Sequence, residues 1–131
     1  MPLTLIAPIR VGTLAALTAV AAALLTLSAC SSGPASVSGT TWGSAPGTSG
    51  TPSITFETNG SLSGTDGCNV IGGDWKEADR TVELTMFSTM MYCEGVDMWL
   101  TESRTAQLTG AELVFSGENG REVGRLTQLD G

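Results

Sequence analysis

The sequence predicts a small, mainly β domain, an antiparallel barrel-like fold with one short helix, preceded by a signal peptide and a flexible linker. Apolar residues alternate with polar ones in short runs, as at residues 53–58 and 81–84, which is the period of half-buried strands. Asn-Gly pairs at 59–60 and 119–120 indicate hairpin turns. A helix is expected only at residues 95–104. The 131 residues suffice for one domain.

Residues 1–29 are typical of a secretory signal. Arg10 is followed by an uncharged apolar run at 11–27 that closes on Leu27-Ser28-Ala29-Cys30. This ending resembles the lipobox of bacterial lipoproteins, which implies cleavage before Cys30 and lipid attachment to its sulfur. The alternative is an uncleaved membrane anchor, because the run reaches the minimum span of about 17 residues. The absence of Lys or Arg directly after Cys30 argues against that anchor. Both alternatives place the domain outside the cytoplasm, in the cell envelope.

The charge of the chain limits its partners. Cleavage before Cys30 leaves 102 residues with five cations and thirteen acids, a net charge of −8. Such a chain repels nucleic acids and anionic headgroups, so we expect no nucleic acid as a partner. We expect the membrane to be reached through acyl chains on Cys30, such as palmitate, and more than one chain is needed because a single chain binds weakly.

The first part of the secreted chain is expected to be a tether. Residues 30–38 are rich in Ser, Gly, Ala and Pro, a composition that cannot bury enough apolar surface to order itself. The domain is expected over residues 39–131. Because Trp42 would be costly to expose, residues 40–42 are predicted to be a short first strand, followed by a mobile loop at 43–52.

The next strands are predicted from alternation and from turn residues. Ile54 and Phe56 point to the core from residues 53–58, and a type I′ turn is expected at Asn59-Gly60, since both central residues of that turn need positive φ. Leu62 lies on the returning strand, and residues 63–69 form a tight, irregular corner.

The middle of the chain continues in strands. Residues 70–75 are predicted to be a strand in which Gly72-Gly73 marks a bulge or a close backbone approach. The charged residues 76–80 predict a turn, and residues 81–84 the strand after it. Residues 86–92 are mostly apolar and are expected to be buried.

The last third holds the helix candidate. At residues 95–104 it would be marginal alone, and the adjacent Met98, Trp99 and Leu100 cannot share one face, so one of them is expected to be exposed. An exposed apolar cluster can mark a partner surface. Further strands are predicted at 107–108, 113–115 and 123–129, with Gly124 at a bulge.

Two cysteines remain once Cys30 carries lipid. In an oxidising compartment, the simplest outcome for Cys68 and Cys93 is a disulfide, which would stabilise the domain by about 3 kcal/mol. Two free buried thiols, or redox or metal chemistry, are the alternatives. The spacing is not Cys-x-x-Cys, and neither cysteine neighbours a His or Lys that would lower a thiol pKa.

Enzymatic activity is not expected. The chain has no histidine, which removes the usual general base and the commonest zinc ligand. Asp66 and Asp74 flank the corner and could form a carboxylate pair or a Ca²⁺ site. An Asp in a Gly-rich turn more often bonds its own backbone, and the spacing of an EF-hand loop is missing. We therefore expect no catalytic residue, no metal and no cofactor.

Five runs in this order resemble the META domain, the family of the heat-shock protein HslJ. They are Gly39-Thr40-Thr41-Trp42, Ile54-Thr55-Phe56, Ser63-Gly64-Thr65-Asp66-Gly67-Cys68-Asn69, Gly73-Asp74-Trp75 and Thr89-Met90-Met91-Tyr92-Cys93-Glu94. The resemblance covers residues 39–129 and implies a barrel-like domain with one helix after the second cysteine, here expected to be trimmed. It also implies an envelope location and links to stress responses, without an agreed activity.

The corner at 63–69 is expected to be structural. Gly64 and Gly67 would allow the turn, Asp66 and Asn69 would satisfy its backbone, and Cys68 would tie it to the segment before the helix. We expect a non-enzymatic, lipid-anchored envelope module that binds a partner or serves in stress tolerance. The alternative is a barrel that binds a small apolar ligand, which would need an internal cavity of a few hundred Å³.

Overall fold

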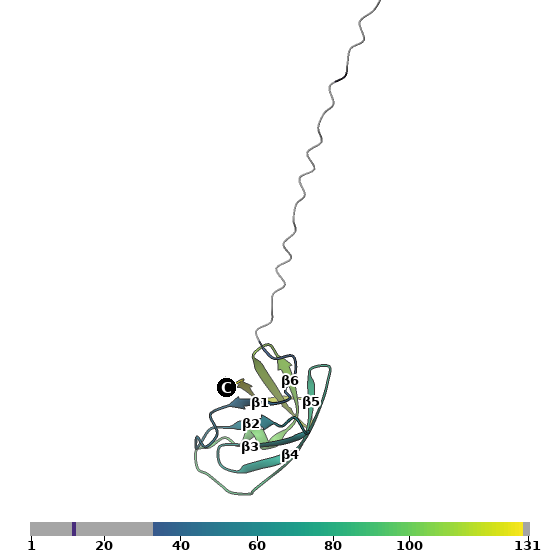
Figure 1. Cartoon of the computed structure of the whole chain (residues 1–131). Coiled ribbons are helices and arrows are strands. Elements are labelled where there is room, and N and C mark those ends of the chain that lie inside the picture. The colour runs from purple at the N-terminus through teal and green to yellow at the C-terminus, as the bar shows by residue number, and fades with distance from the viewer. Residues whose placement is uncertain (1–11, 13–32, 130–131) are drawn as a thin grey trace, which may run out of the picture.

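The computed structural model describes residue 12 and residues 33–129, and its main feature is one antiparallel sheet of eight strands. The strands follow one another in the sheet in chain order, so each pairs with its neighbours in the sequence (Figure 1). They are β1 (Thr40–Gly43), β2 (Ser53–Phe56), β3 (Ser61–Thr65), β4 (Val70–Ala78), β5 (Thr81–Ser88), β6 (Ser103–Thr109), β7 (Glu112–Gly117) and β8 (Glu122–Thr127). A single 3-10 turn, η1 (Trp99–Glu102), lies between β5 and β6.

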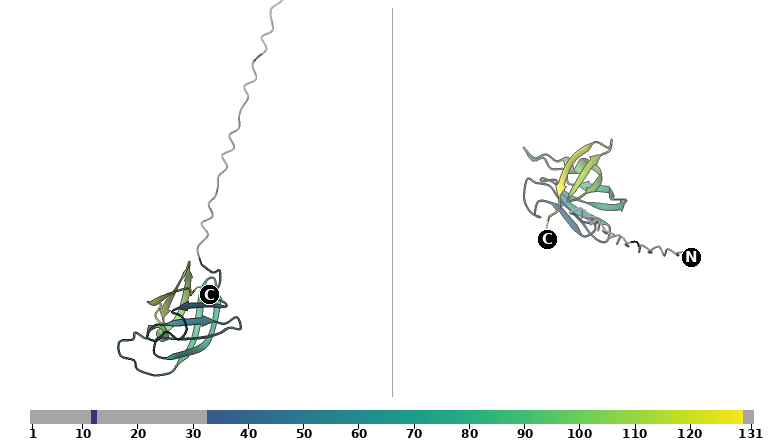
Figure 2. Two further views of the ribbon diagram at one scale, coloured as in Figure 1. Left: turned by 60° about the vertical axis from the view of Figure 1, so that its left-hand side comes forward. Right: turned by 90° about the horizontal axis from the view of Figure 1, so that it is seen from above.

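The sheet curls until its two edges nearly meet (Figure 2). Trp42 of β1 forms an isolated bridge with Gln128, just after β8, and the Leu129 N–H donates to the Thr41 carbonyl oxygen at 2.8 Å. The mainly β, barrel-like prediction is therefore confirmed. In the described part of the chain, no helix is long and apolar enough to cross a membrane. Cys30 and the apolar run before it lie outside the described residues.

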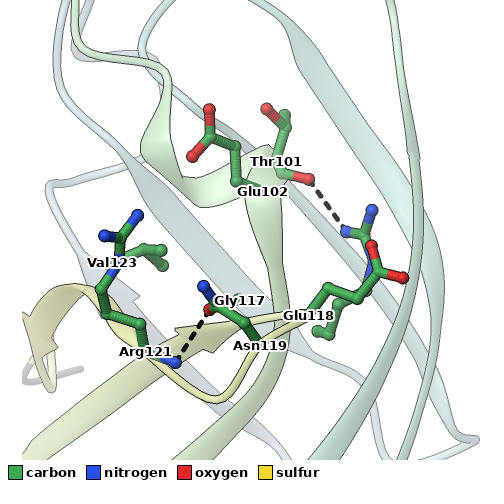
Figure 3. Close-up of a pocket in the computed structure, with 8 residues that line it drawn as sticks. Thr101, Glu102, Gly117, Glu118, Asn119, Arg121 and Val123 are labelled. Atoms are coloured by element: carbon green, nitrogen blue, oxygen red, sulfur yellow. Dashed lines mark hydrogen bonds between the residues drawn. The ribbon is translucent and has the colours of Figure 1, made fainter.

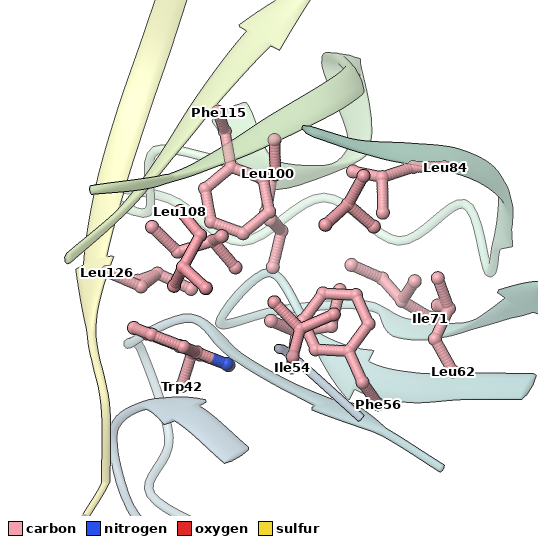
Figure 4. Close-up of a cluster of buried hydrophobic side chains, with 14 residues drawn as sticks. Trp42, Ile54, Phe56, Leu62, Ile71, Leu84, Leu100, Leu108, Phe115 and Leu126 are labelled. Atoms are coloured by element: carbon pink, nitrogen blue, oxygen red, sulfur yellow. The ribbon is translucent and has the colours of Figure 1, made fainter. Parts of the chain in front are cut away.

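Large apolar side chains fill the inside of the curled sheet (Figure 4). Trp42, Phe56 and Phe115 are completely buried, and the Trp42 indole N–H donates to Thr40 Oγ1 at 2.7 Å. Val37 is also completely buried, although it falls in the range expected to be tether. Its backbone N–H donates to the carboxylate of Glu77 at 3.0 Å, so ordered packing begins before residue 39.

The hairpin at Asn59-Gly60 forms, but the predicted type I′ turn is wrong. Gly60 alone takes positive φ, 90°, because Asn59 stays in the ordinary region and its Oδ1 accepts the Ser61 N–H at 2.9 Å. The two-residue turn with positive φ is instead Asp79-Arg80, with φ of 51° and 64°. The predicted turn at 76–80 is therefore too long, since β4 continues to Ala78.

The glycines of β4 permit a close backbone approach, one of the two alternatives predicted. A Cβ on Gly73 would lie 2.0 Å from the Thr85 carbonyl oxygen of β5, and the β4–β5 register runs without a shift. Near the C-terminus the register between β7 and β8 shifts at Val123, next to the predicted bulge at Gly124. The Trp99 ring packs on Gly124, where an added Cβ would meet it at 2.5 Å.

The predicted helix at 95–104 is wrong. Within that range only Trp99–Glu102 is helical, in 3-10 geometry, and β6 begins directly afterwards at Ser103. The three adjacent apolar residues at 98–100 cannot form the stripe that would hold an α-helix against the core. Leu100 is fully buried, and the Ser103 hydroxyl donates to its carbonyl oxygen, which ends the turn.

Candidate functional site

The predicted corner at 63–69 is shorter in the structure, because residues 63–65 belong to β3 and only residues 66–69 turn, around a buried carboxylate. Asp66 has no exposed surface, and its Oδ1 accepts the backbone N–H groups of Cys68, at 2.8 Å, and of Asn69. Gly67 takes a φ of 99°, and a Cβ on Gly64 would lie 2.2 Å from the Ser53 carbonyl oxygen. The corner is therefore an Asx-type turn whose glycines are required by backbone conformation and by close approach.

The side chain of Asn69 connects the corner to a distant segment through hydrogen bonds. Its Oδ1 accepts the Met91 N–H and the Thr89 hydroxyl, the latter at 3.0 Å, and its Nδ2 donates to the Met91 carbonyl oxygen at 3.1 Å. Two residues before Met91, the Thr89 N–H donates to the Val70 carbonyl oxygen at 3.1 Å. The Asn69 side chain therefore acts as the next partner in the β4–β5 ladder and holds residues 89–91 extended.

A disulfide fixes the end of the same segment. Cys68 and Cys93 are bonded, with their Cα atoms 5.8 Å apart. In this state neither sulfur is a free thiol. Asp66 does not join Asp74 in a carboxylate pair, because the first is buried in the turn and the second is exposed on β4. Among the described residues, no group of three or more His, Cys, Asp or Glu could hold a metal ion.

Around these two anchor points the chain exposes large apolar side chains. We name residues 87–92 the apolar segment. Phe87 is 72% exposed, Met90 98% and Tyr92 82%, so the prediction that residues 86–92 are buried is wrong. The segment lies outside because the interior is already filled and because Asn69 and the disulfide hold it at the rim. Phe87 covers Gly72 of the adjacent strand, where an added Cβ would meet its ring at 2.6 Å.

A groove of about 540 Å³, open to solvent, runs between the end of β5 and η1. The groove exists because β5 pairs with β6 only from Thr81 to Glu83, after which the two strands part. It is lined by Asn69, Ser88, Thr89, Met90, Met91, Tyr92, Val96, Asp97, Met98, Thr101 and Glu102. The alternation of the sequence gave no sign of this groove, since it depends on where two distant strands separate.

A second hollow, of about 640 Å³, lies between η1 and the turn that joins β7 to β8 (Figure 3). Acidic and basic residues alternate around it, among them Glu102, Glu118 and Arg121. The Asn119 Oδ1 already accepts the Arg121 N–H at 3.0 Å, as the dashed line in Figure 3 shows. Both acidic and basic residues line this hollow, and Val123 is the one aliphatic side chain among them, so the hollow selects no particular class of ligand.

The fold and the site define a small antiparallel β-barrel domain with one stabilised, exposed apolar rim. The model of the META domain family matches residues 35–129, so the chain belongs to the META domain family. This family and the barrel-like fold support a non-enzymatic β-barrel domain.

One solved structure is similar in part. It is a DUF4847 family protein from Bacteroides vulgatus, with 20% identity and a TM-score of 0.44, and the match covers 60% of this chain and 61% of that one. The similarity thus spans less than two thirds of that protein's length. A comparison with curated proteins finds no match.

Proposed function

We propose that the protein is a lipid-anchored, non-catalytic module of the cell envelope that acts by docking a protein partner. One observation carries the docking part, namely that the exposed apolar segment is held in place by Asn69 and by the Cys68–Cys93 disulfide. Apolar area in contact with water costs about 25 cal/mol per Å². A contiguous exposed patch that is fixed in place is typical of an interaction site.

The anchoring part is supported by the sequence. Leu27-Ser28-Ala29-Cys30 follows an uncharged apolar run, and ordered packing is already present at Val37. Six residues separate Cys30 from Val37, which extend over about 20 to 25 Å at most. Acyl chains on Cys30 would therefore keep the domain close to the membrane, while its net charge of −8 keeps it off anionic headgroups. The resemblance to a heat-shock protein suggests envelope stress as the setting.

The non-catalytic part is supported by the chemistry of the side chains. The sequence has no histidine. The carboxylate of Asp66 is occupied by backbone N–H groups, and the thiols of Cys68 and Cys93 are joined. The alternative role, binding of an apolar ligand inside the barrel, is disfavoured because Trp42, Phe56 and Phe115 occupy that space.

The anchoring proposal is tested by comparing the wild-type chain with Cys30→Ser, and with Ser31→Ala as the matched control. We expect the wild type and Ser31→Ala in the membrane fraction, with an intact mass that begins at Cys30 and includes acyl groups. Cys30→Ser should lack the acyl mass. A wild-type protein that retains residues 1–29 and carries no lipid would show that the apolar run is an uncleaved anchor and would overturn the proposal.

A further inference from the structure

We propose that the groove between β5 and η1 binds an extended, apolar segment of a partner protein that carries Lys or Arg, and that this segment adds a strand to the open edge of β5. The inference rests on the proposed function in one respect, that the partner is a protein. Three properties of the groove carry it: an unpaired strand edge, an adaptable apolar lining and an acidic rim.

The strand edge is open along the second half of β5. The β4–β5 ladder runs over eight residue pairs, from Ala78↔Thr81 to Ile71↔Ser88, whereas the β5–β6 ladder ends at Glu83↔Thr105. Beyond Glu83, β5 therefore has a paired neighbouring strand on one side only, within the described residues.

The direction of the backbone groups follows from the hydrogen bonds on the β4 side. The N–H groups of Thr89 and Met91 point to Val70 and to Asn69. Because these groups alternate in direction along an extended chain, the N–H groups of Ser88 and Met90 point the opposite way, to the groove. Natural sheets protect such an edge with Lys, Pro or a bulge, and residues 86–90 contain none of these.

The lining of the groove is apolar and adaptable. Three of the chain's five methionines, Met90, Met91 and Met98, line it together with Tyr92 and Val96. Methionine side chains are unbranched and polarisable, and they are common on surfaces that accept peptides of varied sequence. An added strand would place alternate side chains on this lining, while its backbone pairs with Ser88, at the end of β5, and with the residues that follow it along the groove.

The rim determines the charge of the occupant. Asp97 and Glu102 line the groove, Glu94 is exposed close by in the chain, and none of the lining residues is Lys or Arg. A cationic segment is complementary to this rim. A second copy of the chain would bring the same acidic rim, and an anionic lipid surface would likewise be repelled. Charge thus favours a basic peptide over either of these occupants.

The test uses protein produced from the full chain, reconstituted in nanodiscs of neutral phosphatidylcholine, with empty nanodiscs as the blank. The probe is a labelled ten-residue peptide of alternating Val and Thr with Lys at both ends, and the same peptide with Glu at both ends is its control. Fluorescence anisotropy measures binding. Two further Lys peptides are N-methylated at alternate residues, one at the odd positions and one at the even positions. The N–H groups of an extended peptide alternate between its two edges, so each of these peptides loses its hydrogen-bond donors along one edge only.

We expect the Lys peptide to bind, the Glu peptide to bind at least tenfold more weakly, and one of the two N-methylated peptides to lose binding while the other keeps it. The double variant Asp97→Lys/Glu102→Lys should weaken binding by roughly tenfold or more, whereas the matched control Glu83→Lys/Glu118→Lys, at exposed positions outside the groove, should change it less than about twofold. Equal binding of both N-methylated peptides would overturn strand addition, and an unchanged affinity in the first double variant would overturn the groove as the site. Neither result depends on acylation, which the Cys30→Ser comparison tests separately.

Discussion

The buried carboxylate of Asp66 accepts a hydrogen bond from the side-chain amide of Asn69 at 3.2 Å, and Asn69 uses its remaining groups to bind the backbone of Met91. The two residues thereby connect the turn after β3 to a segment 22 positions further along the chain. The same amide nitrogen also lies 3.3 Å from the Met98 sulfur, at the groove. This relationship contributes to the order of the corner and, together with the Cys68–Cys93 disulfide, to the fixed position of the apolar segment.

Replacing Asp66 by Asn should destabilise the domain. The variant keeps the size of the side chain and one acceptor oxygen, but it places an NH2 donor where Asp66 Oδ2 accepts the Asn69 amide, so two buried donors face each other. We expect the free energy of unfolding to fall by about 1–3 kcal/mol, measured by urea denaturation. Asp74→Asn, on the exposed part of β4, is the control and should change it by less than about 0.5 kcal/mol. Equal stability of the two variants would mean that the corner does not depend on the Asp66 carboxylate.

Replacing Asn69 by Ala should release the apolar segment without unfolding the barrel. The variant removes the acceptor of the Met91 N–H and the donor to its carbonyl oxygen. Hydrogen exchange should therefore become faster at Met91, while the core strands β6 and β7 keep their protection. Asn119→Ala removes a comparable bond to Arg121 and should accelerate exchange only there. Unchanged exchange at Met91 would show that Asn69 is not what holds the segment.

Replacing Cys93 by Ser should lower stability under oxidising conditions. The disulfide closes a loop with a sequence separation of 25, and chain-entropy arithmetic gives about 3 kcal/mol for such a loop. For a domain of this size the melting temperature should fall by about 10 °C or more, followed by circular dichroism. Wild-type protein with reductant should melt near the variant. A melting temperature that responds to neither change would mean that the bond adds nothing to stability.

The positions of most strands along the chain and the turn beside Asp66 were predictable because their signals are local. Trp42 in a polar stretch, the alternation around Ile54 and the glycines beside Asp66 each indicate their own conformation. The disulfide followed from counting cysteines in an oxidising compartment.

Two of the wrong predictions, at residues 86–92 and 95–104, share a physical cause, since they concern residues whose state is set by distant contacts. Residues 86–92 looked like core by composition, but their exposure depends on Asn69 and on a barrel interior that other strands already fill. The helix at 95–104 failed because Leu100 packs into the core and Trp99 onto Gly124, which a 3-10 turn followed by a strand allows. At Asn59-Gly60 a side-chain hydrogen bond to Ser61 selected the turn type.

The most direct test of the docking groove is hydrogen exchange at single-residue resolution on the reconstituted protein, with and without the Lys-flanked peptide. Strand addition predicts slower exchange at the amides of Ser88 and Met90, which point to the groove, and little change at Thr89 and Met91, which are already bonded on the β4 side. Protection that is absent at Ser88 and Met90, or that is confined to the second hollow around Asn119, would contradict strand addition at the groove.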